Sequence, residues 1–339
     1  MSLTFPFTEA PENHQVVTIH PHVKWVRSPL PFSLAHINCY LLKDGDGWCV
    51  LDTGMNGKEA ISRWEKIIAE GLDGAPITRV ISTHHHPDHN GLAGWFCDTY
   101  KVPFYTTEAE YYYTRTFYAP KRSERYWESA EYFDRTGINE ESKEALLADS
   151  NYSHMVTEVP GAFHRVVDGD RLKIGDYEWE AITTRGHSPE HLSLYCEALD
   201  MMLSGDQVLP AITSNVSISP TQAYANPLKD WFDAHDKVKA RIPDSVLVLP
   251  AHELPFKGLH QRLQAVVDHH HERLDKIVTL CGTSINPQEI TNELFDREMD
   301  EFQNFLAVGE VMAHLNWLLN EKRVSVCVEN GVYQFSADF

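Results

Sequence analysis

Cysteines and long apolar runs are scarce in this sequence. None of its apolar stretches approaches the roughly 20 residues of a membrane-spanning helix, so we expect no membrane segment. Its 6 cysteines include no C-x-x-C pair, which argues against a disulfide framework and against a thiolate zinc site. The N-terminus lacks the basic, apolar and small-residue pattern of a signal peptide. These absences predict a cytoplasmic protein.

Positive charge is also scarce. The chain has 29 Lys and Arg residues against 49 Asp and Glu residues, a formal net charge of −20 at pH 7. Such a charge repels polyanions, so we expect no nucleic-acid or membrane partner and favour a small-molecule substrate. It leaves open the formation of a homo-oligomer. No serine lies in the G-x-S-x-G context, so the sequence offers no nucleophile of that kind.

The length and the order of elements predict two domains. A chain of 339 residues exceeds one typical core, and 42% hydrophobic with 23% charged residues is an ordinary globular composition. Strands and one helix alternate up to about residue 103, and strands return between about residues 166 and 252. We expect a catalytic domain at residues 1–257 with a helical insertion at about 104–165, and a C-terminal domain at residues 258–339.

The motif THHHPDHNG at residues 83–91 follows a predicted strand and is rich in metal-binding side chains. An extended backbone points His84 and His86 to one side and His85 to the other, so we expect His85 not to be a ligand. The proline stiffens the loop, and Asp88 and His89 follow it directly.

Further candidates stand at equivalent places downstream. His187, Asp206 and His252 each come just after a predicted strand. Strand ends on one edge of a sheet converge where open α/β sheets bind ligands. Five histidines and two aspartates suit two divalent ions bridged by a carboxylate and a water.

This ordered set resembles the metallo-β-lactamase-fold hydrolases over residues from about 15 to 255. The resemblance implies an α/β (α+β) fold, a four-layered αββα sandwich with the metals at one edge. It assigns three residues to each metal and one bridge: His84, His86 and His187; Asp88, His89 and His252; and bridging Asp206. We expect two divalent ions, with zinc preferred and iron or manganese as alternatives.

Two more residues enter through this resemblance. Asp52 in VLDTG is expected to support the metal loops by hydrogen bonds that fix ligand orientation. His191 has three open interpretations: it supports a ligand, faces the substrate, or packs in the core. Arg185 and Glu190 depart from the proline and glycine that are frequent at these places in the family.

The metals imply the reaction. Two cations lower the pKa of the water between them, generate a bridging hydroxide near neutral pH and polarise the oxygen under attack. Asp88 is the candidate catalytic residue, which orients that hydroxide and accepts its proton. We expect hydrolysis of a small ester, thioester, lactone or amide. The alternatives are a metal-dependent endoribonuclease or phosphodiesterase, and a mononuclear iron redox enzyme of the same fold.

The C-terminal domain is predicted to be winged-helix-like, with helices followed by a hairpin whose turn is Asn330-Gly331. It resembles the appendage of a β-lactamase-like subfamily that includes endoribonucleases. From residue 258 onward it has six basic and thirteen acidic residues, a net charge of −7. This is the wrong sign for a phosphate backbone, so we expect it to pack on the catalytic domain or on another subunit.

Two other features have open roles. Consecutive positions on a helix are about 100° apart, so His269, His270 and His271 cannot converge on one ion, and a structural or solvated role is favoured. The aromatic residues of the insertion either bury the faces of its helices or wall the substrate pocket. Lys121, Arg122 and Arg125 are candidates for binding an anionic substrate group, with a solvated surface as the favoured alternative.

Overall fold

The computed structural model describes residues 3–12, 14–31, 34–117, 127–148 and 153–337. They form two compact units, each made of three separate stretches of the chain. Unit 1 comprises Met1–Pro120, Tyr152–Ser214 and Lys237–Leu263, and unit 2 comprises Lys121–Asn151, Asn215–Asp236 and Gln264–Phe339. The expected boundary after residue 257 therefore does not separate the two units, because residues 121–151 and 215–236 also belong to unit 2.

Unit 1 contains two sheets. The first has seven strands among the described residues, in the spatial order of their numbers. They are β1 (Val17–His20), β2 (Val23–Pro29), β3 (His36–Asp44), β4 (Gly47–Leu51), β5 (Ile77–Ile81), β6 (Phe104–Thr106) and β7 (His164–Arg165). Strands β1 to β4 are antiparallel neighbours, and β4 to β7 pair in parallel. Because helices cover parallel strands, β4 is buried along its whole length.

The second sheet has five strands in the order β12-β11-β10-β9-β8 among the described residues. They are β8 (Arg171–Ile174), β9 (Tyr177–Thr184), β10 (His191–Cys196), β11 (Met201–Gly205) and β12 (Leu247–Pro250). Strands β11 and β12 are parallel, and β10 is antiparallel to both β9 and β11. The chain therefore leaves β9, β11 and β12 at the same edge of this sheet.

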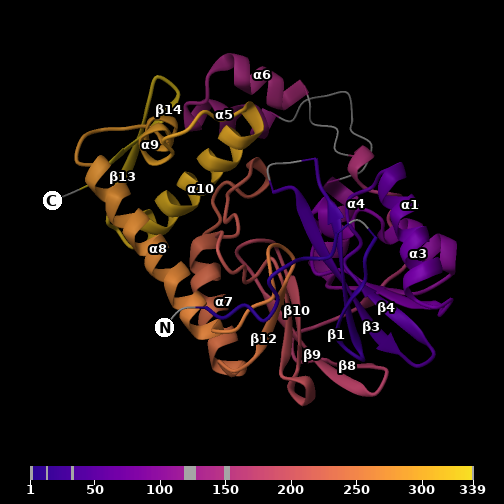
Figure 1. Ribbon diagram of the computed structural model, residues 1–339. Coiled ribbons are helices and arrows are strands. Elements are labelled where there is room, and N and C mark those ends of the chain that lie inside the picture. The colour runs from indigo at the N-terminus through magenta and orange to yellow at the C-terminus, as the bar shows by residue number, and fades with distance from the viewer. Residues whose placement is uncertain (1–2, 13, 32–33, 118–126, 149–152, 338–339) are drawn as a thin grey trace. The chain divides into compact units, whose positions relative to one another are not determined.

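The two sheets pack face to face, with helices outside them (Figure 1). Side chains such as Trp25, Trp179 and Leu203 fill the layer between the sheets. Helices α1 (Lys58–Lys66) and α3 (Ala93–Tyr100) cover the outer face of the first sheet. Residues 237–263, which include the end of α7 (Pro227–Arg241) and the start of α8 (Leu259–Leu280), cover the outer face of the second. This confirms the expected αββα sandwich.

The predicted insertion is less uniform than expected. Its ends, β6 and β7, are strands of the first sheet. Helix α4 (Glu108–Phe117) packs in unit 1, where Tyr111 joins the core beneath α1 and α3. Helices α5 (Trp127–Thr136) and α6 (Glu140–Ala148) belong to unit 2. The basic candidates at positions 121, 122 and 125 lie outside the described residues.

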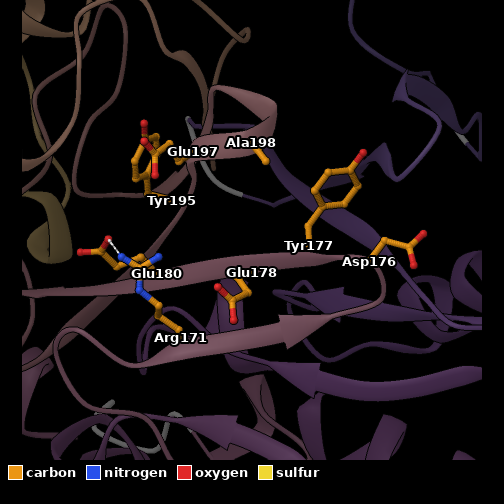
Figure 2. Close-up of a pocket in the computed structure, with 8 residues that line it drawn as sticks. All are labelled: Arg171, Asp176, Tyr177, Glu178, Glu180, Tyr195, Glu197 and Ala198. Atoms are coloured by element: carbon orange, nitrogen blue, oxygen red, sulfur yellow. Dashed lines mark hydrogen bonds and ion pairs between the residues drawn. The ribbon is translucent and has the colours of Figure 1, made fainter.

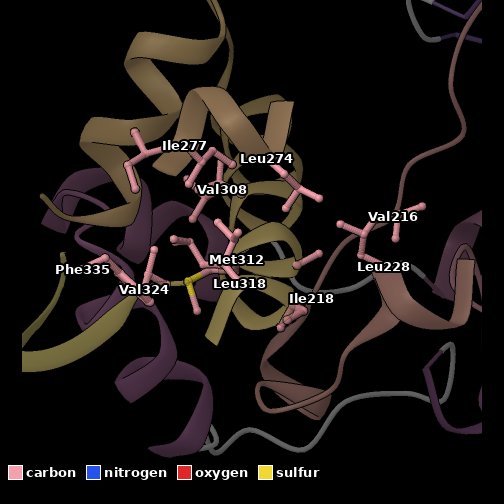
Figure 3. Close-up of a cluster of buried hydrophobic side chains, with 14 of the residues drawn as sticks. Val216, Ile218, Leu228, Leu274, Ile277, Val308, Met312, Leu318, Val324 and Phe335 are labelled. Carbon is pink, nitrogen blue, oxygen red and sulfur yellow. The ribbon is translucent and has the colours of Figure 1, made fainter. Parts of the chain in front are cut away.

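Unit 2 has its own apolar core (Figure 3). Residues from the α5 region, the start of α7, the end of α8, α9 (Pro287–Leu294) and α10 (Glu301–Asn320) contribute to it. Asn286 and Glu289 form a capping box at the start of α9. Strands β13 (Ser325–Glu329) and β14 (Val332–Ser336) form the predicted hairpin around Asn330-Gly331, both with positive φ. The winged-helix description stays a prediction.

Among the described residues, no helix is both long enough and apolar enough to cross a membrane.

The consecutive histidines of α8 have different surroundings. His271 is exposed and stacks on Phe232, whereas His270 is buried beside His314 of α10. His270 Nδ1 lies 3.1 Å from His314 Nε2, and His314 Nδ1 donates to the carbonyl of Glu310 at 2.7 Å. Desolvation lowers the pKa of His270 to about 2 and that of His314 to about 3. Both are therefore neutral in the folded unit.

We predict that this pair makes unit 2 lose stability in mild acid. Both pKa values lie below the ordinary value near 6.5, so unfolding takes up two protons once the pH falls below about 6.5. The free energy of unfolding then falls with decreasing pH, with a slope that approaches about 3 kcal/mol per pH unit from this pair once the pH is well below 6.5. Denaturant unfolding at pH 7.5 and 5 should show a smaller acid loss for His270→Gln and an unchanged loss for the exposed control His271→Gln. Equal acid losses for wild type and His270→Gln would contradict the assignment.

Candidate metal centre

The predicted ligands all follow strands that end at one edge of the sandwich. The loop after β5 carries His84 and His86, and a short helix, α2 (Pro87–Asn90), carries Asp88 and His89. The remaining three follow strands of the second sheet: His187 after β9, Asp206 after β11 and His252 after β12. The structure brings all seven side chains together in two groups.

The first group contains three imidazoles and one carboxylate oxygen. His84 Nε2 lies 2.8 Å from His86 Nδ1 and 3.2 Å from His187 Nε2. Asp206 Oδ2 lies 3.4 Å from His187 Nε2 and 4.0 Å from His84 Nε2. The backbone of residues 83–86 is bent rather than extended, yet the rings of His84 and His86 lie beside each other.

The second group lies on the other oxygen of the same aspartate. Asp206 Oδ1 is 3.3 Å from His252 Nε2 and 3.5 Å from His89 Nε2. Asp88 Oδ2 lies 3.5 Å from His252 Nε2 and 3.6 Å from His89 Nε2. Asp206 thus presents one oxygen to each group, which is the arrangement that a bridging ligand requires.

Asp52 fixes the orientation of two imidazoles, that of His89 directly and that of His84 through Thr83. Its carboxylate accepts hydrogen bonds from the Thr83 amide and hydroxyl, each at 2.8 Å, and from His89 Nδ1 at 2.7 Å. Because the Thr83 hydroxyl gives its proton to Asp52, it accepts from His84 Nδ1 at 3.0 Å. Protons on both Nδ1 atoms leave the Nε2 lone pairs of His84 and His89 facing the two groups.

His252 is oriented in the same way by a backbone carbonyl. Its Nδ1 donates to the carbonyl oxygen of His36 at 2.7 Å, which leaves the Nε2 lone pair directed at Asp206 and Asp88. Asn38 and Tyr40 of β3 donate to the carbonyl of Pro250 at 2.9 and 2.8 Å. Strand β3 therefore holds the loop that carries His252.

Three buried atoms at the centre fit a cation. His89 Nε2, His252 Nε2 and Asp206 Oδ1 have no hydrogen-bond partner among the described residues, although each is shielded from solvent. A buried polar atom without a partner is costly, and a buried carboxylate more so. Imidazole nitrogens and carboxylate oxygens form the donor set of zinc and related divalent ions. Binding of cations by the seven side chains stays a prediction.

The electrostatics of the two ligand groups also favour cation binding. Burial alone would lower the pKa of His252, but Asp206 and Asp88 outweigh it and raise that pKa to about 10. The same carboxylates raise the pKa of His89 against desolvation. In His84, where desolvation is reinforced by neighbouring imidazoles, the pKa is lowered. The carboxylates thus create a site that favours positive charge.

His191 is fully buried beside the predicted ligands. Its Nε2 accepts a hydrogen bond from the amide of Asp206 at 3.1 Å. Gly205 has φ +52°, and a Cβ there would lie 2.6 Å from His191 Nε2. Of the three interpretations of His191, the structure favours support of a ligand, because its ring holds the backbone that carries Asp206.

Sequence reasoning missed a buried carboxylate, Glu110 of α4. His85 lies outside both candidate groups, and its ring nitrogen Nδ1 is 2.7 Å from Glu110. Burial raises the pKa of Glu110, but the hydrogen bond and charge of His85 outweigh it and keep the pKa below its ordinary value. No local feature of the sequence marks Glu110. It stands beside tyrosines in a helix whose amphipathic pattern is typical of a surface helix.

A separate pocket lies on the second sheet (Figure 2). Its walls include Asp176, Glu178, Glu180 and Glu197, and Arg171 lies 3.4 Å from Glu180. It contains none of the seven predicted ligands, so it is distinct from the candidate metal centre.

Comparison with known proteins shows where the chain belongs. Residues 34–252 match the Metallo-beta-lactamase superfamily, and residues 274–338 match the domain described as "Metallo-beta-lactamase-like, C-terminal domain". The probable metallo-hydrolase YqjP of Bacillus subtilis is 24% identical over 317 residues, which cover 91% of this chain and 96% of that protein.

Two solved structures are similar along nearly the whole chain. A beta-lactamase domain protein from Burkholderia ambifaria is 35% identical with a TM-score of 0.92, covering 99% of this chain and 98% of that one. A metallo-beta-lactamase family protein from Thermus thermophilus is 25% identical with a TM-score of 0.80, covering 95% and 100%. The chain belongs to the metallo-β-lactamase superfamily of metal-dependent hydrolases.

Proposed function

We propose that this protein is a binuclear hydrolase of small carboxylic acid derivatives, namely esters, thioesters, lactones or amides. The observation that carries the proposal is Asp206, whose two oxygens face two separate groups of ligand atoms. His84, His86 and His187 would hold one divalent cation with Asp206, and Asp88, His89 and His252 would hold the second. Zinc fits this donor set, with iron and manganese as alternatives.

The chain's own residues divide the remaining work. When bound, the cations acidify water and polarise the substrate carbonyl. Asp88 is less buried than His89 and His252, so its carboxylate is placed to orient the attacking water and accept its proton. His86 is also partly exposed, whereas His84 is fully buried and the His187 side chain is only 4% exposed. Substrate therefore approaches from the side on which His86 and Asp88 lie.

Thioesters are the preferred substrates within this class. The atrochrysone carboxyl ACP thioesterase of Aspergillus fumigatus is 22% identical over 318 residues, covering 88% of this chain and 61% of that protein. The hydroxyacylglutathione hydrolase of Rhodospirillum rubrum is 28% identical over 123 residues, covering 36% and 45%. Both names describe hydrolysis of an acyl thioester, a reaction that needs no nucleophilic serine or cysteine when cations activate water.

The other two interpretations have less support. Formal charges of −20 for the chain and −7 from residue 258 onward oppose binding of RNA. The group of Asp88, His89 and His252 beside Asp206 supports two cations rather than a single iron. We also retain as predictions a small-molecule partner and a cytoplasmic location.

We predict two cations per chain and activity that chelation removes. Elemental analysis of the purified protein should find about two divalent ions per chain, because two ligand groups are present. A panel of thioester, ester, lactone, β-lactam and phosphodiester substrates, with and without chelator, identifies the reaction. Hydrolysis of a thioester that is lost on chelation and restored by zinc is expected. One iron per chain, or cleavage of the phosphodiester alone, would refute the proposal.

Replacement of Asp88 tests its role as the catalytic residue. Asp88→Asn removes the proton acceptor and weakens a ligand, so kcat should fall by about 100-fold or more. The matched control is Asp98→Asn on α3, an exposed aspartate outside both groups, which should leave kcat and KM unchanged. Wild-type turnover by Asp88→Asn, with cations still bound, would contradict the assigned role.

Asp52→Asn tests the orientation of His89. The amide cannot accept from Thr83 and His89 as the carboxylate does, so His89 Nε2 is no longer reliably free to bind a cation. Cation affinity should fall by about 10-fold to 100-fold, as judged by competition with a chromophoric chelator. Unchanged affinity in a correctly folded variant would mean that Asp52 does not orient His89.

A further inference from the structure

A single buried carboxylate connects two of the loops that carry the predicted ligands. Glu110 lies in the first turn of α4 and is 1% exposed. It belongs to neither ligand group, and the proposed reaction assigns it no step. A carboxylate is rarely buried unless donors surround it, so its contacts show what it is for.

Each oxygen of Glu110 accepts from a different loop. Oε2 accepts from the amide of His85 at 2.9 Å and lies 2.7 Å from His85 Nδ1. Oε1 accepts from the Ser188 hydroxyl and the Glu190 amide, each at 2.7 Å. His85 stands between two predicted ligands of the first group, and Ser188 directly follows the third. Glu110 therefore joins the two loops that supply all three imidazoles of that group.

Further contacts fix α4 itself to the same loops. The Glu190 carboxylate accepts from the amide of Ala109 at 3.1 Å, and Thr107 donates to the Glu190 carbonyl at 2.8 Å. Thr114 lies one turn after Glu110 on α4, and its hydroxyl accepts from the side chain of Asn90 at 3.0 Å. Asn90 directly follows His89, the second predicted ligand on α2. Helix α4 is thus a fixed support rather than a mobile cover for the loops.

We propose that Glu110 is a positioning residue, which holds the loops of His84, His86 and His187 at the separation that lets the three imidazoles share one cation. This rests on the proposed metal-dependent function. Glu110 does not touch the reacting atoms. It acts through His85 and Ser188, so its loss affects the first group directly and the second group only through α2.

Glu110→Gln is the test variant. An amide accepts on one side only, so the side chain can serve His85 or the Ser188–Glu190 loop but not both. Stepwise zinc titration against a chromophoric chelator should show one cation bound about 10-fold to 100-fold more weakly and the other nearly unchanged. The absorption spectrum of the cobalt-substituted protein should change, kcat should fall with KM retained, and excess zinc should restore part of the activity.

Two controls separate positioning from folding. Glu108→Gln makes the same chemical change on the same helix, where the carboxylate is about half exposed and pairs with Arg165 at 3.1 Å. It should leave both zinc affinities unchanged, since exposed ion pairs contribute little. Ser188→Ala removes one donor to Glu110 and no charge, so it should weaken the same cation by a smaller factor. Circular dichroism and thermal unfolding of the metal-free variants report whether each folds.

The outcomes distinguish this proposal from the proposed function. If wild type binds no cation, or chelation leaves hydrolysis unchanged, the proposed function fails. If wild type behaves as a binuclear hydrolase and Glu110→Gln matches it in both affinities, only the positioning role fails. If Glu110→Gln weakens the binding of both cations equally and also lowers the unfolding temperature, the positioning role is overturned as well. If Glu110→Gln does not fold, Ser188→Ala decides: a selective loss supports positioning, and unchanged affinities overturn it.

Discussion

The carboxylate of Asp206 is the constraint around which this protein is built. It is buried between imidazoles of both groups, and a buried carboxylate is stable only with positive charge and hydrogen bonds around it. Its amide is held by His191, and its oxygens point to opposite groups. The burial of this one charge makes cations, or protons on the histidines, a requirement rather than an accessory.

The αββα sandwich supplies what the ligand loops cannot supply themselves. An imidazole is held in the right tautomer and orientation to bind a cation with one nitrogen when its other nitrogen donates to an acceptor. Those acceptors come from distant places: the Asp52 carboxylate after β4, the Thr83 hydroxyl after β5 and the His36 carbonyl at the start of β3. Packing the two sheets against each other brings these groups to between 2.7 and 3.0 Å from the ring nitrogens they orient.

Sequence reasoning picked out the seven side chains that the structure gathers into two groups, because each is a chemically distinctive residue placed just after a strand. Strand ends are local features, so their convergence follows from topology alone. The turn at Asn330-Gly331 was equally accessible, because its positive φ angles favour these two residues. The role of Asp52 was inferred from family resemblance, and the hydrogen bonds to Thr83 and His89 give it a physical basis.

What sequence reasoning missed depends on contacts between distant segments. Strands β6 and β7 have three and two residues, too few for a period-2 pattern, so the insertion was drawn too wide. Helices α5 and α6 bury their apolar faces in unit 2, where no periodicity could place them. Alternation along the chain predicted only that the His85 side chain points away from the candidate ligands. It could not identify the partner of His85, because Glu110 lies 25 residues away in the sequence.

The predicted ligands differ in how deeply they are buried. This difference separates the residues that determine the type of reaction from those that can contact a substrate. His84, His89 and His252 are completely buried and oriented by internal acceptors, so their positions are set by the core of unit 1. His86 and Asp88 are partly exposed, so the groups that meet a substrate are the ones that water reaches. A fixed inner half and an accessible outer half let one arrangement of ligands serve many acyl substrates, which explains why reaction type is readable from this sequence and substrate identity is not.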